Sequence, residues 1–153
     1  MGAASRGSRR SRTERRRSGA ALAGRLWALP CTLLGLALGL PLLLAGGSLR
    51  RVDGVLELAL HRGEVPPGRR AAWLPFAAIT FGHVVLGVSH AALARLRAHE
   101  RVHVRQYERW GPLFLVAYPL ASVLMLLRGR RPYADNPFEV QARRAGEPGG
   151  AGP

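Results

Sequence analysis

Hydrophobic positions along this chain form two long uncharged runs, separated by two stretches with the character of β-strands. The first run extends from Leu26 to Ser48 and contains no charged residue. About 20 apolar residues are enough for a helix to cross the hydrocarbon core of a bilayer. Pro30 and Pro41 interrupt the run, but membrane helices tolerate proline. The pattern predicts a transmembrane helix within residues 20–48.

Arginine dominates the residues that precede this run. Residues 1–19 have no apolar periodicity and are predicted to be a disordered tail. Arginine on this side places the N-terminus in the cytoplasm. A cleaved signal peptide is the alternative, because the small residues "AGG" stand at the end of the run. The long basic segment before the run, and Arg50–Arg51 soon after it, favour an uncleaved signal anchor.

Two strands are predicted after the anchor. Residues 50–60 alternate between apolar and polar positions, which is typical of a strand. Residues 71–88 contain the second, most clearly in "AITFGHVVLGV", where β-branched residues concentrate. The intervening "GEVPPGRR" predicts a turn or loop. Together with the helices that follow, these strands predict a small α+β domain over residues 50–145.

The longest predicted helix follows the second strand. Ser89 is its expected N-cap, and helical periodicity continues from His90 to Trp110, where Gly111–Pro112 end it. A last short helix is expected to begin at Asn136–Pro137 and to end near Arg144. The residues after it, 146–153, are predicted to be a second disordered tail.

The second apolar run, residues 113–127, predicts another helix. Fifteen residues give about 23 Å, which is shorter than the roughly 30 Å of hydrocarbon in a bilayer. We therefore expect this helix to pack in the domain core or to dip into the membrane interface. Arg128, Arg130 and Arg131 follow it, and they keep open the alternative of a second membrane span.

Composition changes this picture only slightly. The net charge is +14 and all basic residues are arginine, but the N-terminal tail carries much of the excess. The charge therefore does not indicate nucleic-acid binding, and the expected partner is membrane lipid. Abundant Gly, Ala and Arg with no Lys suggests a GC-rich bacterial genome. Cys31 is the only cysteine; it can form no intramolecular disulfide and is expected to be buried.

The strongest chemical signal is the sequence from His99 to His103, which has the pattern H-E-x-x-H. On a helix, His103 lies about 40° around the axis from His99 and one turn further along. Two imidazoles can then bind one metal ion, and Glu100 on the flank can take a proton from an activated water. The alternative is an exposed, charged helix. The apolar stripe through Ala92 and Leu96 favours the metal site.

A catalytic zinc also needs a third protein ligand. The three-histidine arrangement is absent, because Gln106 and Arg109 occupy the positions in question. A downstream acid is the remaining choice, and Glu139 is the best candidate, with Asp135 second. A competing explanation for Glu139 is a capping box with Asn136 at the start of the last helix.

The sequences "HERVHVRQYERWGP" and "YADNPFEVQAR" give this chain a family resemblance. A strand, an HExxH helix, a connecting helix and a later glutamate resemble the minimal gluzincin arrangement of zinc metallopeptidases. The chain is also similar to small bacterial membrane proteins with an HExxHxxQ helix and an NPFE segment. The resemblance implies a zinc ion bound by His99, His103 and Glu139, with Glu100 as general base.

Other polar residues near these motifs have less specific expectations. Tyr133 and His83 are candidates for stabilising an oxyanion, and a core or loop role is the alternative for both. His90, at the start of the long helix, and His61, in the loop, are expected to be structural or to lie at the surface.

The sequence therefore predicts a zinc-dependent metallohydrolase, peptidase-like, anchored in the bacterial cytoplasmic membrane by one helix. Its C-terminal domain would lie outside the cytoplasm and act on a peptide or protein. One alternative is a non-catalytic metal-binding or interaction protein that retains a zincin fold. Another is a basic membrane-surface protein without metal. A different divalent ion could also occupy a His₂Glu site.

Overall fold

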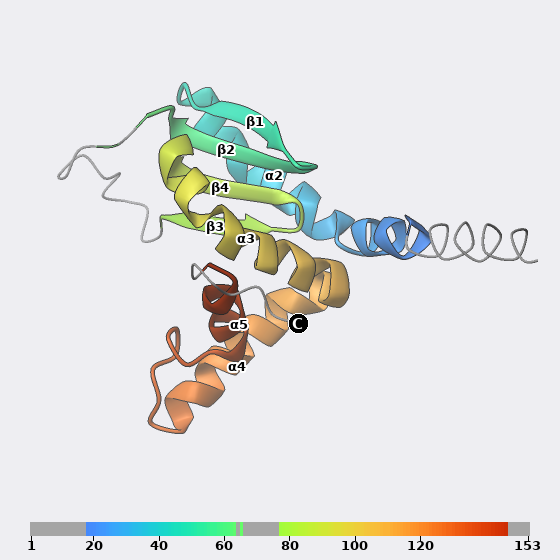
Figure 1. Ribbon diagram of the computed structural model, residues 1–153, viewed down its shortest axis with the longest axis vertical. Coiled ribbons are helices and arrows are strands. Elements are labelled where there is room, and N and C mark those ends of the chain that lie inside the picture. The colour runs from blue at the N-terminus through green and yellow to red at the C-terminus, as the bar shows by residue number, and fades with distance from the viewer. Residues whose placement is uncertain (1–17, 64, 66–76, 147–153) are drawn as a thin grey trace, which may run out of the picture.

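A computed structural model describes residues 18–63, 65 and 77–146 (Figure 1). Within them the protein is α+β, as predicted, with one mixed four-stranded sheet and several helices. The predicted tails, residues 1–19 and 146–153, lie almost wholly outside this part, as does most of the predicted loop at 63–70. The innermost residues of the two predicted tails are helical. One helix begins at Ser18, and another ends at Gly146.

Each of the two predicted strands is in fact a β-hairpin. The first consists of β1 (Ser48–Val52) and β2 (Val55–His61), and the second of β3 (Ala78–Phe81) and β4 (Val84–Ser89). Asp53 and Gly54 join the first pair with φ angles of 47° and 81°. Positive φ at both central residues is what a tight hairpin turn requires, and Asp-Gly supplies it. A single strand over 50–60 was therefore wrong.

The strand order in the sheet is β1-β2-β4-β3, with β2 and β4 parallel at the centre. Side chains of β4 alternate between the two faces. Val84 and Leu86 pack on the N-terminal helix side, while Val85 joins Leu93 of the long helix on the other. Helix α2 (Leu29–Leu44) thus covers one face of the sheet and α3 (His90–Trp110) the other. Strand β3 is left at one edge, beside α3 (Figure 1).

The predicted transmembrane segment folds as two helices, Ser18–Trp27 and α2, which are bent by 52°. Helix α2 lies close to the sheet because two glycines face it. A Cβ atom at Gly35 would come within 2.8 Å of Val84, and one at Gly39 within 2.5 Å of Leu58. The two helices are long and apolar enough to cross a membrane only if they count as one broken span. The continuous helix predicted over 20–48 does not form.

The predicted long helix is confirmed at both ends. The Ser89 hydroxyl accepts a hydrogen bond of 3.1 Å from the backbone N–H of Ala92, which caps α3. Gly111, with φ of 55°, ends the helix and opens a short 3₁₀ turn, η1 (Gly111–Leu113). Helix α4 (Phe114–Leu127) follows and leaves in a different direction (Figure 1). By length and composition, His90–Leu127 is one stretch that could cross a membrane.

Helix α4 does not pack in the core, which was one of its two expected locations. Only Phe114 and Met125 are buried in it, whereas Leu120 is 64% and Leu127 is 79% exposed. After α4 the chain turns back, and α5 (Pro137–Gly146) packs against α3 (Figure 1). Helix α4 therefore projects from the domain, and the two helices that carry the predicted ligands lie side by side.

Candidate metal centre

The imidazoles of His99 and His103 and the carboxylate of Glu139 meet between α3 and α5. One potential ligand atom from each lies within 4.8 Å of the others. The two Nε2 atoms are 3.1 Å apart, and Glu139 oxygens lie 3.2 Å from Nε2 of His103 and 3.4 Å from Nε2 of His99. Ligands bound at about 2.0–2.1 Å in a tetrahedral zinc site are about 3.3 Å apart. The triangle therefore has the dimensions of a zinc ligand set.

Glu139 supplies a carboxylate oxygen that its protein surroundings leave unsatisfied. The residue is 2% exposed, and its Oε2 atom has no hydrogen-bond partner among the described residues. Burial alone would raise the pKa of this carboxyl, but the close imidazoles of His103 and His99 and the hydrogen bond from Tyr118 outweigh it and hold the pKa well below its usual range. A buried, charged oxygen without a partner is costly unless a cation binds it.

The orientation of His103 is set by Gln106, one turn later on α3. The Gln106 amide nitrogen donates to the backbone oxygen of Phe138 at 3.1 Å and to Oε1 of Gln141 at 2.8 Å. The amide oxygen therefore faces His103 and accepts from its Nδ1–H at 2.8 Å. With the proton on Nδ1, the lone pair of Nε2 points at the triangle, as it does in histidines that bind metals.

Asn136 brings Glu139 into place. Its side-chain oxygen accepts from the backbone N–H of Phe138 at 2.9 Å and so caps α5. Its amide nitrogen donates to the backbone oxygen of Tyr118 at 3.2 Å and to the Ser122 hydroxyl at 2.8 Å, which ties α5 to α4. The Tyr118 hydroxyl in turn donates to Glu139 Oε1 at 2.7 Å. Asn136 thus caps alone, and the Glu139 carboxylate faces the histidines instead of closing a capping box.

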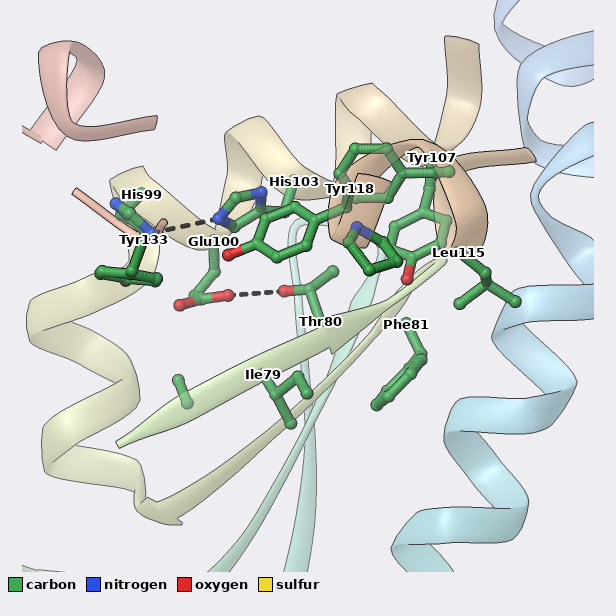
Figure 2. Close-up of a pocket in the computed structure, with 13 residues that line it drawn as sticks. Ile79, Thr80, Phe81, His99, Glu100, His103, Tyr107, Leu115, Tyr118 and Tyr133 are labelled. Atoms are coloured by element: carbon green, nitrogen blue, oxygen red, sulfur yellow. Dashed lines mark hydrogen bonds between the residues drawn. The ribbon is translucent and has the colours of Figure 1, made fainter. Parts of the chain in front are cut away.

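Glu100 faces a cavity of about 230 Å³ that the two histidines also line (Figure 2). The residue is 6% exposed, and its Oε2 atom accepts a hydrogen bond of 2.6 Å from the Thr80 hydroxyl on the edge strand β3. Figure 2 shows Glu100 between the imidazoles and that strand. The Glu100 carboxylate and the two imidazoles therefore line the same cavity.

Tyr133 is the one of the two oxyanion candidates that the fold brings to the cavity. Partial burial and the neighbouring Glu139 carboxylate raise its pKa to about 12, so its hydroxyl stays protonated and able to donate at neutral pH. His83 lies elsewhere: its Nε2 atom is 3.0 Å from Glu108 Oε1, and its backbone N–H donates to Thr32 of α2. An oxyanion role for His83 was therefore wrong.

The other candidates lie outside the triangle. The Asp135 carboxylate accepts from the backbone N–H of Arg131 at 2.9 Å, and Asp135 is not among the residues that line the cavity. His61 is exposed, as predicted. His90 is buried at the start of α3, where its Nε2 atom lies 2.9 Å from the Ser48 hydroxyl. The structure thus brings together the predicted ligands and the predicted base, and it places Asp135 outside the candidate metal site.

Sequence reasoning missed Tyr118 and Thr80, which orient Glu139 and Glu100. For Tyr118 a signal was present. Within the apolar run 113–127, only Tyr118 and Ser122 carry polar side-chain groups, and both contact residues that lead to α5. Polar side chains on one side of an otherwise apolar helix mark the side that meets a polar partner. Thr80 gave no comparable signal, because threonine is ordinary in a strand.

The fold and the site define the class only broadly, as an α+β protein with a His₂Glu group of metal-binding size. No protein-family model matches the chain, and comparison with curated proteins and with solved structures also found no match. The geometry of the site is therefore the main indication of function.

Proposed function

We propose that this protein is a membrane-bound, zinc-dependent metallohydrolase that cleaves peptide bonds. One observation carries the proposal: two imidazole Nε2 atoms converge with the buried, partly unsatisfied carboxylate of Glu139, and the same two histidines line a cavity together with a second carboxylate, Glu100. The resemblance of the HExxH helix and the later NPFE segment to minimal gluzincins supports the same assignment.

The donor set suits zinc. Two histidines and one glutamate are among the three-ligand sets of catalytic zinc sites, which leave a fourth position for water or substrate. A zinc ion bound there would act as a Lewis acid that makes water a nucleophile at neutral pH and polarises a carbonyl. Gln106 and Tyr118 would hold His103 and Glu139 in the ligating orientation.

The remaining roles belong to residues that line the cavity. Glu100 is the proposed general base, which takes the proton of the attacking water and passes it to the leaving amine. The Thr80 hydroxyl fixes the Glu100 carboxylate through their 2.6 Å hydrogen bond. Tyr133, which keeps its proton, is the proposed donor to the oxyanion of the tetrahedral intermediate.

Membrane attachment completes the proposal, and the apolar stretch His90–Leu127 supports it. A single-pass anchor at residues 20–48, with the site outside the cytoplasm, stays a prediction. The packing of α2 on the sheet opposes it, because a crossing α2 would carry β2 and β4 into the hydrocarbon. Sheet edges in lipid leave backbone groups without hydrogen bonds.

A pair of matched variants tests the proposal. Purified wild type and Glu100→Gln are assayed for zinc content and for hydrolysis of an unfolded, fluorescently labelled protein. We expect both to hold zinc, with hydrolysis about 10²–10⁴-fold slower in the variant. Glu108→Gln is the control, because Glu108 lies on the same helix but pairs with His83 outside the cavity. Equal hydrolysis by wild type and Glu100→Gln would contradict the assigned base. Zinc-loaded wild type that hydrolyses nothing would favour a non-catalytic metal-binding protein.

A further inference from the structure

Helix α4 presents an uninterrupted apolar face away from the rest of the protein. The outward positions recur at helical spacing and are all exposed: Leu113, Val116, Leu120, Val123, Leu124 and Leu127. The polar side chains of the helix, Tyr118 and Ser122, are instead used inside, for Glu139 and Asn136. A helix of this composition is ordinarily buried in protein or lipid. A contiguous apolar surface of this kind marks an interaction site.

We propose that this outward face of α4 lies in one leaflet of a bilayer with anionic headgroups and does not cross it. The cavity would then open beside the membrane surface, and its substrate would be a polypeptide segment at that surface. The second part rests on the proposed hydrolase function, whereas the first part does not.

The length and the return of the chain explain why α4 cannot cross. Fourteen residues give about 21 Å, whereas the hydrocarbon core is about 30 Å thick. After α4 the chain returns to the same side, because Asn136 bonds back to Tyr118 and Ser122. Glu139 then meets His99 of α3. Both ends of α4 therefore belong to one side of a membrane, and the helix can only lie in the interface.

The charges around α4 indicate lipid as the occupant. Arg128, Arg130 and Arg131 follow the helix directly and are exposed, and within the described part of the chain only Arg131 of the three forms an ion pair, with Asp135. Arginines beside an inserted apolar helix bind anionic headgroups, each adding to the affinity. Exposed Trp110 precedes the helix, and tryptophan is enriched at membrane interfaces. A two-fold dimer with parallel α4 helices would instead bring equivalent arginine groups toward each other.

The same helix forms part of the wall of the cavity. Leu115 and Pro119 line it together with His99, His103 and Tyr133 (Figure 2). Leu115 is itself exposed, so the apolar surface of α4 continues to the cavity. If α4 lies in the leaflet, the shortest approach for a peptide is along the membrane surface. A substrate tethered to the same bilayer is then held near the site at high local concentration.

Single-cysteine probes test where α4 lies. In a Cys31→Ser background, Leu120→Cys and Val123→Cys are labelled with an environment-sensitive fluorophore. Ala98→Cys, an exposed position on α3, is the matched control. The full chain is reconstituted into phosphatidylcholine vesicles with or without phosphatidylglycerol. We expect the fluorophores at 120 and 123 to be quenched by lipids that carry shallow nitroxides, more so with phosphatidylglycerol, while the fluorophore at 98 stays in water.

Three results would overturn the docking proposal. The first is equal solvent access at 120 and 98 in vesicle-bound protein. The second is protection of 120 without lipid, accompanied by disulfide dimers of the unlabelled Leu120→Cys chain, which would show a second copy on this face. The third is labelling of an Arg130→Cys probe from the side of the vesicle opposite to Ala98→Cys, which would show that α4 crosses.

Hydrolysis tests the substrate class separately. We expect wild type in vesicles to cleave a lipid-tethered peptide at least about tenfold faster than the same free peptide. A Leu120→Asp/Leu124→Asp variant should lose this preference, because each buried leucine adds about tenfold or more to membrane affinity. Its zinc content and cleavage of the free peptide should not change. Equal cleavage of both peptides by wild type would refute the substrate class. If neither peptide is cleaved, the proposed hydrolase function fails. The fluorescent probes still test whether α4 lies in the membrane.

Discussion

Two groups of buried histidine and glutamate lie along α3, one near its start and one past its middle. In the first, the Arg97 guanidinium covers both carboxylate oxygens of Glu57, at 2.9 and 3.1 Å, and His90 contacts Ser48. In the second, the Nε2 atoms of His99 and His103 converge with Glu139, and no arginine takes part.

The difference lies in where the lone pairs point. Glu57 is neutralised by a forked ion pair with Arg97, so its carboxylate needs no metal ion. Glu139 Oε1 accepts a hydrogen bond from Tyr118, whereas Oε2 has no hydrogen-bond partner among the described residues and lies 3.4 Å from Nε2 of His99. Buried histidine and glutamate therefore do not by themselves indicate a metal site. A metal site is indicated where acceptor atoms converge and no cationic side chain neutralises them.

Among the changes that test this difference between the two groups, removal of a candidate ligand should have the largest effect on bound zinc. His103→Ala is expected to reduce bound zinc from about one ion per chain to near zero, because two ligands seldom hold zinc in competition with buffer. His90→Ala, which removes the buried histidine of the other group, should leave zinc content unchanged. Elemental analysis of the purified variants measures both. Equal loss from both variants would show that the zinc depends on the fold and not on this triangle.

Loss of the contact that orients His103 should have the next largest effect. Gln106→Leu is expected to weaken zinc binding about 10–100-fold, because the Nδ1–H of His103 loses its acceptor. Gln106→Glu keeps an acceptor at that position and should retain most of the affinity. Competition with a fluorescent chelator measures both dissociation constants. If the two variants bind zinc equally, Gln106 acts only as packing between α3 and α5.

The Arg97 pair provides the opposite test. Arg97→Met leaves Glu57 buried without its cation, and we expect the free energy of unfolding to fall by about 2 kcal/mol, since Arg97 is partly exposed. Zinc affinity should not change. Adding Glu57→Gln should restore part of the stability, because the unpaired charge is removed. Chemical denaturation of the three proteins measures this, and no recovery in the double variant would argue against the pair.

The smallest effect expected is a pH dependence confined to the triangle. Burial lowers the pKa of His103, but bonds to Glu139 and Gln106 outweigh it and raise the pKa above 6.5. Zinc binds the neutral ring, so affinity should fall up to about tenfold per pH unit as the pH drops through that raised pKa.

The metal-free protein should respond in the opposite sense. The contribution of His103 to its stability is complete below the unfolded pKa and is lost as the pH rises through the folded one. The depressed pKa of Glu139 leaves that carboxylate charged throughout this range. Titration of zinc affinity and of thermal stability between pH 5 and 9 checks both signs. The slope of the zinc affinity should be unchanged in His90→Ala, and a flat zinc affinity would contradict the assignment of His103.

Local signals in the sequence predicted much of the fold. Ser89 and Gly111 mark the two ends of α3 because a hydroxyl cap and a positive φ act within one turn. The hairpins were missed because Asp53–Gly54 and Gly82 stand inside apolar runs that alternate as a single strand would. For the first hairpin the Asp-Gly pair was a signal of the turn, which the positive φ angles of Asp53 and Gly54 bear out.

The sequence predicted the candidate ligands of the site better than it predicted the residues that orient them. The spacing of His99 and His103 fixes their common face on any helix, whereas Glu139 was selected only as the best of the downstream acids, and a resemblance then supported it. Long-range contacts, such as Thr80 with Glu100 across 20 positions, depend on how the sheet packs against α3. The sequence also left two locations open for α4, the core and the membrane interface, because an apolar run has the same pattern in a core and in a membrane.

X-ray absorption at the zinc edge of the purified wild-type protein tests the central claim most directly. We predict about four nitrogen or oxygen neighbours at about 2.0–2.1 Å, with the outer-shell scattering of two imidazoles. This is the signature of His99, His103, Glu139 and one non-protein ligand. A sulfur neighbour at about 2.3 Å, which only Cys31 or the two methionines could supply within one chain, would contradict the account. So would zinc with fewer than two imidazoles.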